Sequence, residues 1–258
     1  MFEKIKCFIL DMDGTIYLGN ELFPFTKDFL KKVEDTGREY YFFTNNSSKS
    51  QQAYIEKLGK LGIQIKKDQM MTSSHVIVKY LKEHYEGKSI YVLGTQSLIQ
   101  EFQYFDMNLT EEDPDIVVLG FDTTLTYEKL SKACHYIRNG CIYFGINPDW
   151  NCPMEGGAFI PDCGSIAKLI EASTGRFPEF FGKPSKHTLD YIIQETGYEP
   201  DEIAIVGDRL YTDIAVADQS DAMSILVLSG ESTREDVKTS DVKPNVILED
   251  LSEITKML

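Results

Sequence analysis

The chain has 258 residues, of which 42% are hydrophobic, and this length and composition allow one large or two smaller globular domains with a real core. Forty-one acidic residues against 26 basic ones give a net charge of -15, which argues against sequence-independent binding to nucleic acid but not against a small phosphorylated substrate. Five cysteines without a Cys-x-x-Cys pair, a polar start and the lack of an apolar run of about 20 residues predict a cytoplasmic protein with reduced thiols and no membrane contact.

Strand-like and helix-like segments alternate from the start of the chain. Strands are predicted at residues 7–10 and 39–43, and helices at residues 25–35 and 49–60. Gly37 is typical of a left-handed helix cap, and Ser47 or Ser48 is expected to cap the second helix at its N-terminus. Further strands are predicted at residues 89–93, 116–119, 141–146, 203–206 and 223–228. This alternation indicates an α/β fold built on a parallel sheet.

An Asp-Met-Asp-Gly-Thr sequence, residues 11–15, directly follows the first predicted strand. Its apolar run of four predicts a strand buried on both faces, and in open α/β sheets ligands bind at the carboxyl ends of the strands. Gly14 lets the backbone turn closely around a bound group. Asp and Gly are also the commonest turn residues, so a simple turn is the alternative interpretation.

Three further polar clusters occur along the chain, and like the first they lie at or near the end of a predicted strand. Thr44-Asn45-Asn46-Ser47 and the segment 207–213 each follow a predicted strand, and Lys183 lies within Gly-Lys-Pro. The stretch between residues 78 and 179 carries no cluster of comparable chemistry. We therefore expect a Rossmann-like core of residues 1–77 and 180–258, with residues 78–179 inserted as a second α/β domain.

The four clusters together indicate one kind of chemistry. Carboxylates, a hydroxyl and a lysine that converge on one edge of a sheet make a site for a hard, oxygen-preferring cation and a phosphate group. Each cluster alone could be turn chemistry, but their joint occurrence in this order makes that interpretation weak.

The ordered motifs resemble those of the haloacid dehalogenase (HAD) superfamily. An insert between the second and third motifs is similar to the class with a large α/β cap, and within it to the NagD-like or 4-nitrophenylphosphatase-type branch. The segments that carry this resemblance are residues 11–17, 44–48, 147–149 and 161–165. The resemblance implies a parallel-sheet core with a cap and a phosphatase that uses Mg²⁺.

The resemblance assigns roles to individual residues. Asp11 would be the nucleophile that forms an aspartyl-phosphate, and Asp13 would be the general acid and then the base. Lys183 would neutralise charge in the transition state. Mg²⁺ would contact Asp11, the backbone carbonyl of Asp13, and Asp208. Asp213 would orient metal-bound water or Lys183, with direct binding of the ion as the alternative.

The resemblance also places the substrate. Thr44 and the backbone amide of Asn45, with Asn46 beside them, would bind the phosphoryl oxygens. Asn147, Asp149 and the loop through Asn151, Met154, Glu155 and Gly156 resemble the cap segment that faces the active site in this family. Ile146 stands where related sequences often have threonine, so the sequence of this loop does not identify the leaving group of the substrate.

Hydrolysis of small-molecule phosphomonoesters is the predicted function, with a small phosphorylated metabolite as the partner. The chain could also form a homo-oligomer through the cap. A phosphotransferase or mutase using the same intermediate is one alternative. A phosphate-binding regulatory protein without turnover is another, although intact Asp11, Asp13, Lys183 and Asp208 count against it.

Overall fold

The computed structural model describes residues 2–154, 157–218 and 220–258, and these form two compact units. The first unit contains the described residues within 1–44, 55–71 and 183–258, and the second contains those within 45–54 and 72–182. The expected division into residues 1–77 with 180–258 and residues 78–179 differs from these units mainly in the segment 45–54. The assignment of one domain as a catalytic core and the other as a cap stays a prediction.

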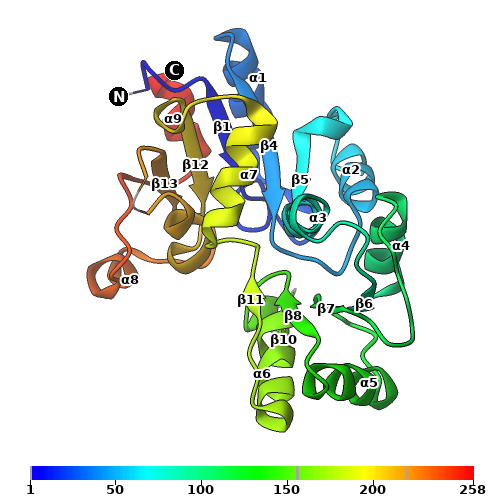
Figure 1. The fold of residues 1–258 in the computed structure, drawn as a ribbon. Coiled ribbons are helices and arrows are strands. Elements are labelled where there is room, and N and C mark those ends of the chain that lie inside the picture. Colours follow the sequence, from blue (N-terminus) through cyan, green and yellow to red (C-terminus); the bar gives the residue numbers. More distant parts are fainter. Residues whose placement is uncertain (1, 155–156, 219) are drawn as a thin grey trace. The chain divides into compact units, whose positions relative to one another are not determined.

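A six-stranded sheet forms the centre of the first unit, in the order β14-β13-β12-β1-β4-β5 (Figure 1). The strands are β1 (Cys7–Leu10), β4 (Glu39–Thr44), β5 (Met70–Thr72), β12 (Ile203–Gly207), β13 (Met223–Val227) and β14 (Val246–Leu248). β1 is fully buried and pairs in parallel with β12 on one side and β4 on the other. The strand order therefore reverses at β1, and such a switch point is where open α/β sheets bind ligands.

Helices flank this sheet, and their buried positions follow the helical period. In α1 (Thr26–Asp35) the residues Thr26, Phe29, Leu30 and Val33 are buried, which is the i, i+3, i+4, i+7 pattern of one face. Gly37 follows α1 with a φ of 72°, as the sequence predicted. The other helices of this unit are α7 (Lys186–Thr196), α8 (Arg234–Thr239) and α9 (Leu251–Met257), with short 3-10 turns at Lys67–Gln69 and Pro200–Glu202 and a two-stranded ribbon of β2 (Tyr17–Leu18) and β3 (Glu21–Leu22).

Helix α2 (Gln51–Lys60) contributes residues to both units. The predicted N-cap, Ser47 or Ser48, is wrong, because the helix begins later. Ser50 precedes the first turn, and its hydroxyl oxygen accepts a hydrogen bond from the Ala53 N–H at 3.3 Å. Ser50 therefore satisfies one of the N–H groups that a helix start leaves without a partner.

The second unit has its own four-stranded parallel sheet, in the order β11-β8-β7-β6. Its strands are β6 (Ile90–Leu93), β7 (Ile116–Leu119), β8 (Ile142–Gly145) and β11 (Glu179–Phe180), and a separate hairpin joins β9 (Asn151–Pro153) to β10 (Phe159–Pro161). Its helices are α3 (Ser73–His84), α4 (Gln96–Tyr104), α5 (Tyr127–Arg138) and α6 (Cys163–Thr174). Alternate strand residues such as Tyr91, Leu93, Val117 and Leu119 pack with residues of α5 and α6 in one apolar core.

The predicted α/β class with a parallel sheet is confirmed. The predicted strands at 7–10 and 116–119 agree with β1 and β7 residue for residue. None of the helices in the described part of the chain has the length and hydrophobicity that a membrane crossing requires.

Candidate active site

Asp11 is the first residue after β1 in the first unit. Its N–H donates to the carbonyl oxygen of Val206 at 2.9 Å, which continues the pairing of β1 with β12. Met12 is buried, whereas Asp11 and Asp13 on either side of it are partly exposed, so the two aspartates share one side as the alternation of an extended chain predicts. The turn that follows places Gly14 at a φ of 87°, a backbone conformation that glycine adopts readily.

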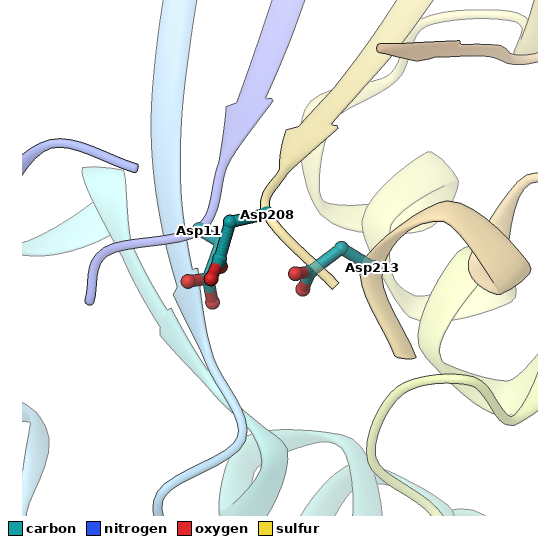
Figure 2. Close-up of side chains that lie close together, drawn as sticks. All are labelled: Asp11, Asp208 and Asp213. Carbon is teal, nitrogen blue, oxygen red and sulfur yellow. The ribbon is translucent and has the colours of Figure 1, made fainter. Parts of the chain in front are cut away.

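Three aspartates of the first unit come together at this sheet edge. Asp11, Asp208 and Asp213 each offer one carboxylate oxygen, and these oxygens lie within 4.8 Å of one another. Figure 2 shows the three carboxyl groups turned toward one another, with Asp208 directly after β12 and Asp213 beyond it. Asp213 lies in a short π-helical turn, Leu210–Ile214. The sequence placed all three near one site, and the structure brings them together.

Burial and clustering together raise the pKa of two of these carboxyl groups. Burial, and then the charge of Asp213, raise the pKa of Asp11 to about 7, although Lys183 and Arg209 act in the opposite direction. Burial, and then the charges of Asp11 and Asp213, also raise the pKa of Asp208. Burial is therefore the main cause of both shifts, and the neighbouring carboxylates add to it.

Lys183 joins two of the three carboxylates. Its Nζ donates to Asp11 Oδ1 and to Asp213 Oδ1, both at 2.6 Å, and to the Phe43 carbonyl oxygen at 3.3 Å. Lys183 is only 3% exposed, so it is a buried lysine and not one of the surface. Although burial opposes its charge, Asp11 and Asp213 raise the pKa of Lys183, so it is a cation at neutral pH. Thr44, also buried, is the next residue after Phe43 and the last of β4.

Asp208 is held by a segment that the sequence did not single out, Ser229–Ser232. The Glu231 N–H donates to Asp208 Oδ2 at 2.7 Å, and the Ser232 N–H donates to the Asp208 carbonyl oxygen at 3.0 Å. A Cβ on Gly230 would lie 2.1 Å from Asp208 Oδ2, and a Cβ on Gly14 would lie 2.5 Å from it, so both positions need glycine. The segment holds Asp208 through backbone N–H groups, which give no sequence signal.

The donor set suits a divalent, oxygen-preferring cation. Asp208 Oδ1 is buried and finds no hydrogen-bond partner among the described residues, and it belongs to a cluster of three carboxylates that offer oxygens within 4.8 Å of one another. Asp11 and Asp208 are the side chains best suited to hold Mg²⁺. Asp213 has both oxygens bonded, Oδ1 to Lys183 and Oδ2 to the Arg209 N–H at 3.0 Å, which supports its expected role in orienting Lys183.

The predicted substrate residues Asn45, Asn147 and Asp149 come together within the second unit. Asn45 Nδ2 donates to Asp149 Oδ2 at 2.8 Å, and Asn147 Nδ2 donates to the same oxygen at 2.9 Å. Asn147 is fully buried, and it also donates to Asp162 Oδ1 at 3.0 Å and accepts from the Ser47 hydroxyl at 2.7 Å. These side chains therefore form a buried hydrogen-bonded network.

Asn46 differs from its neighbour Asn45. Its Oδ1 accepts from the Ser48 N–H at 3.0 Å and from the Ser48 hydroxyl at 2.7 Å, and its Nδ2 lies 3.8 Å from Cys152 Sγ. The side chain thus stabilises the local turn. Glu155 and Gly156 of the predicted substrate loop lie outside the described residues. The substrate roles of all these residues stay predictions.

Two family models match the chain. One, described as haloacid dehalogenase-like hydrolase, covers residues 8–108, and another, described as HAD-hydrolase-like, covers residues 180–254. An acid sugar phosphatase of Staphylococcus aureus is 34% identical over 252 residues, which is 97% of each chain. The first family model spans the segment that carries Asp11, and the second spans those that carry Lys183 and Asp208.

Solved structures give the same result. A 4-nitrophenylphosphatase of Thermotoga maritima is 42% identical with a TM-score of 0.95, covering 99% of this chain and 98% of that one. NagD of E. coli K-12 is 30% identical with a TM-score of 0.88, covering 96% and 98%. The similarity therefore extends over both units. On these grounds the chain belongs to the haloacid dehalogenase-like hydrolases, as its motifs predicted.

Proposed function

We propose that this protein is a magnesium-dependent phosphatase that hydrolyses small phosphomonoesters through an aspartyl-phosphate on Asp11. One observation carries the proposal: Asp11 accepts a hydrogen bond from a buried lysine and lies close to Asp208, one of whose carboxylate oxygens has no partner among the described residues. Phosphoryl transfer needs a nucleophile, balanced charge and positioned donors rather than further covalent chemistry. The relatives named acid sugar phosphatase and 4-nitrophenylphosphatase support the same class of reaction.

In the first step an Asp11 carboxylate oxygen attacks phosphorus, and the bond from phosphorus to the leaving oxygen breaks. The Asp13 carboxyl group gives its proton to that oxygen, so the product leaves as an alcohol. Lys183 orients Asp11 and balances the charge on the transferring group, and Thr44 and the Asn45 amide bind its oxygens. Mg²⁺, held by Asp11, the Asp13 carbonyl and Asp208, would neutralise charge at the phosphoryl group.

The second step regenerates the enzyme. The Asp13 carboxylate takes a proton from a water molecule, whose oxygen attacks phosphorus. The bond between phosphorus and Asp11 then breaks, and inorganic phosphate leaves. Asp11 returns as a carboxylate and Asp13 as a carboxylic acid, so both are ready for a new substrate.

Release of phosphate from 4-nitrophenyl phosphate tests the proposal, measured with Mg²⁺ and with an excess of chelator. We expect turnover with Mg²⁺, its loss with chelator and its return when Mg²⁺ is added back. The Asp11→Asn variant serves as the inactive control. A folded wild-type protein that binds Mg²⁺ but releases no phosphate above background would overturn the enzyme assignment.

The substrate is proposed only as a class, a small phosphorylated metabolite. Sugar phosphates are the first compounds to test, because the relatives from Staphylococcus aureus are named acid sugar phosphatases. A panel that also contains nucleotides and other phosphomonoesters would rank them by kcat/KM. Hydrolysis of none of these, with turnover of the aryl phosphate intact, would show that the natural leaving group lies outside the class.

A further inference from the structure

A second cation, Arg209, lies beside the acidic cluster of the first unit. It is the residue after Asp208, and only 16% of its side chain is exposed. Its guanidinium group is near enough to Asp208 and Asp11 for their charges to act on it. Because a guanidinium group matches the geometry of a carboxylate, it can bind the oxygens of Asp208 in place of a metal ion.

Glu231 binds this arginine on the other side. The Glu231 Oε2 and Arg209 Nε atoms are 2.9 Å apart. The Tyr211 hydroxyl donates to the other oxygen, Glu231 Oε1, at 3.0 Å. One carboxylate thus contacts two side chains of the segment that follows Asp208: it accepts a hydrogen bond from Tyr211, and it pairs with Arg209 by charge, at an ion-pair distance from Nε without hydrogen-bond geometry.

Glu231 also contacts Asp208 through its backbone, because its N–H donates to Asp208 Oδ2 at 2.7 Å. Its neighbours fix that N–H in place. The Ser229 hydroxyl donates to the Gly14 carbonyl oxygen at 2.7 Å, and the Ser232 hydroxyl oxygen accepts from the Leu210 N–H at 3.3 Å. Asp208 therefore has one oxygen held by protein and the other, Oδ1, without a partner among the described residues.

We propose that Glu231 is a positioning residue of the cation site, which keeps the Arg209 guanidinium group off Asp208 and so leaves Oδ1 of Asp208 for the metal. The inference rests on the proposed function, because it assumes that this cluster holds a divalent cation. Glu231 itself touches neither substrate nor metal in this account. Removing its charge would release Arg209 to pair with Asp208, and the guanidinium group would then compete with Mg²⁺.

Isothermal titration of the full-length protein with MgCl₂ tests this idea without any measurement of turnover. Glu231→Gln should weaken Mg²⁺ binding by about 10–100-fold, the range found when an outer partner of a metal ligand is lost. Arg209→Met should not weaken it, because the competitor is removed. The double variant Arg209→Met/Glu231→Gln should bind Mg²⁺ within a few-fold of Arg209→Met. Such a rescue is the result that a merely structural role of Glu231 would not produce.

The matched control is Glu235→Gln, a glutamate of α8 in the same unit whose carboxylate pairs with Lys238 on the surface. It should leave the Mg²⁺ affinity unchanged. Equal affinities of the wild type and Glu231→Gln would overturn the inference, as would a double variant no better than Glu231→Gln. A wild-type protein that binds no Mg²⁺ would instead overturn the proposed function. Circular dichroism of each variant confirms folding, and Glu231→Ala repeats the test if Glu231→Gln is unfolded.

Discussion

At the scale of single residues, Lys183 decides how the acidic cluster is held together. It is buried with two carboxylates, and its Nζ donates to both at 2.6 Å. A buried charge is costly unless it is paired, so the three groups depend on one another. Without the lysine, the Asp11 and Asp213 carboxylates would repel each other at short range.

Lys183→Met is therefore expected to lower the free energy of unfolding by about 3–5 kcal/mol, because it leaves buried carboxylates without their partner. Activity should be lost as well. Urea unfolding with and without Mg²⁺ measures the effect, and added Mg²⁺ should stabilise the variant more than the wild type, since the ion supplies part of the missing positive charge.

The control is Lys238→Met, which removes a lysine whose ion pair lies on the surface. It should change the stability by less than about 1 kcal/mol. If Lys183→Met were as stable as Lys238→Met, the buried pairs of Lys183 would not hold the site together.

At the scale of elements, the geometry of the candidate site depends on the turn after β1 as well as on the strand itself. Gly14 combines a φ of 87° with a close approach to Asp208, so a side chain there meets two separate obstacles. Gly37, after α1 in the same unit, has a φ of 72° but open space around its Cα. A comparison of substitutions at the two positions therefore distinguishes the effect of backbone strain from that of steric contact.

Gly37→Ala should lower stability by about 1–2 kcal/mol, the cost of a left-handed backbone for an L-residue, and Gly14→Ala should lower it further, because its methyl group also meets the Asp208 carboxylate. Only Gly14→Ala should also displace Asp208 and weaken Mg²⁺ binding. Thermal unfolding and Mg²⁺ titration of both variants test this. Equal Mg²⁺ affinity in the two would show that the contact between Gly14 and Asp208 does not matter for the cation.

Another element-scale contact joins the starts of β6 and β7 in the second unit. Asp115 Oδ2 accepts from the Ser89 N–H at 2.9 Å and from the Ser89 hydroxyl at 3.0 Å, and Lys88 Nζ donates to Oδ1 at 3.0 Å. The Ser89 N–H, and then Lys88, lower the pKa of Asp115 from its ordinary 3.8 to about 2. The folded protein therefore favours the charged form of this carboxyl group.

Because the folded-state pKa lies below the ordinary one, Asp115 stabilises the protein above pH 3.8, and this contribution disappears as the pH falls toward 2. Asp115→Asn should thus be less stable than the wild type at neutral pH. The gap should narrow between pH 4 and pH 2, which urea unfolding at a series of pH values would show. A gap that stays constant across this range would contradict the assignment.

At the scale of the whole molecule, the parts predicted well from the sequence are those with strong local signals. β1 and β7 are runs of four apolar residues, so their bounds were predicted residue for residue. Lys183 and Asp208 were found because their motifs occur in a fixed order along the chain. The family assignment rests on the same order and is confirmed.

The parts that escaped prediction lack such local signals. The strands β9 and β10 have three residues each, too few for a pattern to be read. The segment 229–232 holds Asp208 through backbone N–H groups, which any residue but proline has. The burial of Asn147 is a tertiary property, so its hydrogen bonds to Asp149 and Asp162 were not predicted. Its role in substrate binding, like a homo-oligomer through the second unit, stays a prediction.

The covalent step on Asp11 is the central claim, and mass spectrometry tests it most directly. The Asp13→Ala variant is mixed with 4-nitrophenyl phosphate and Mg²⁺, quenched in acid and digested. The aryl oxide leaves without protonation, but hydrolysis of the intermediate lacks its base, so phosphoenzyme should accumulate. We predict one phosphoryl group on the peptide that contains Asp11 and none in Asp11→Asn/Asp13→Ala. Unmodified Asp11 in a variant that still releases 4-nitrophenol, or a phosphoryl group on another residue, would contradict the account.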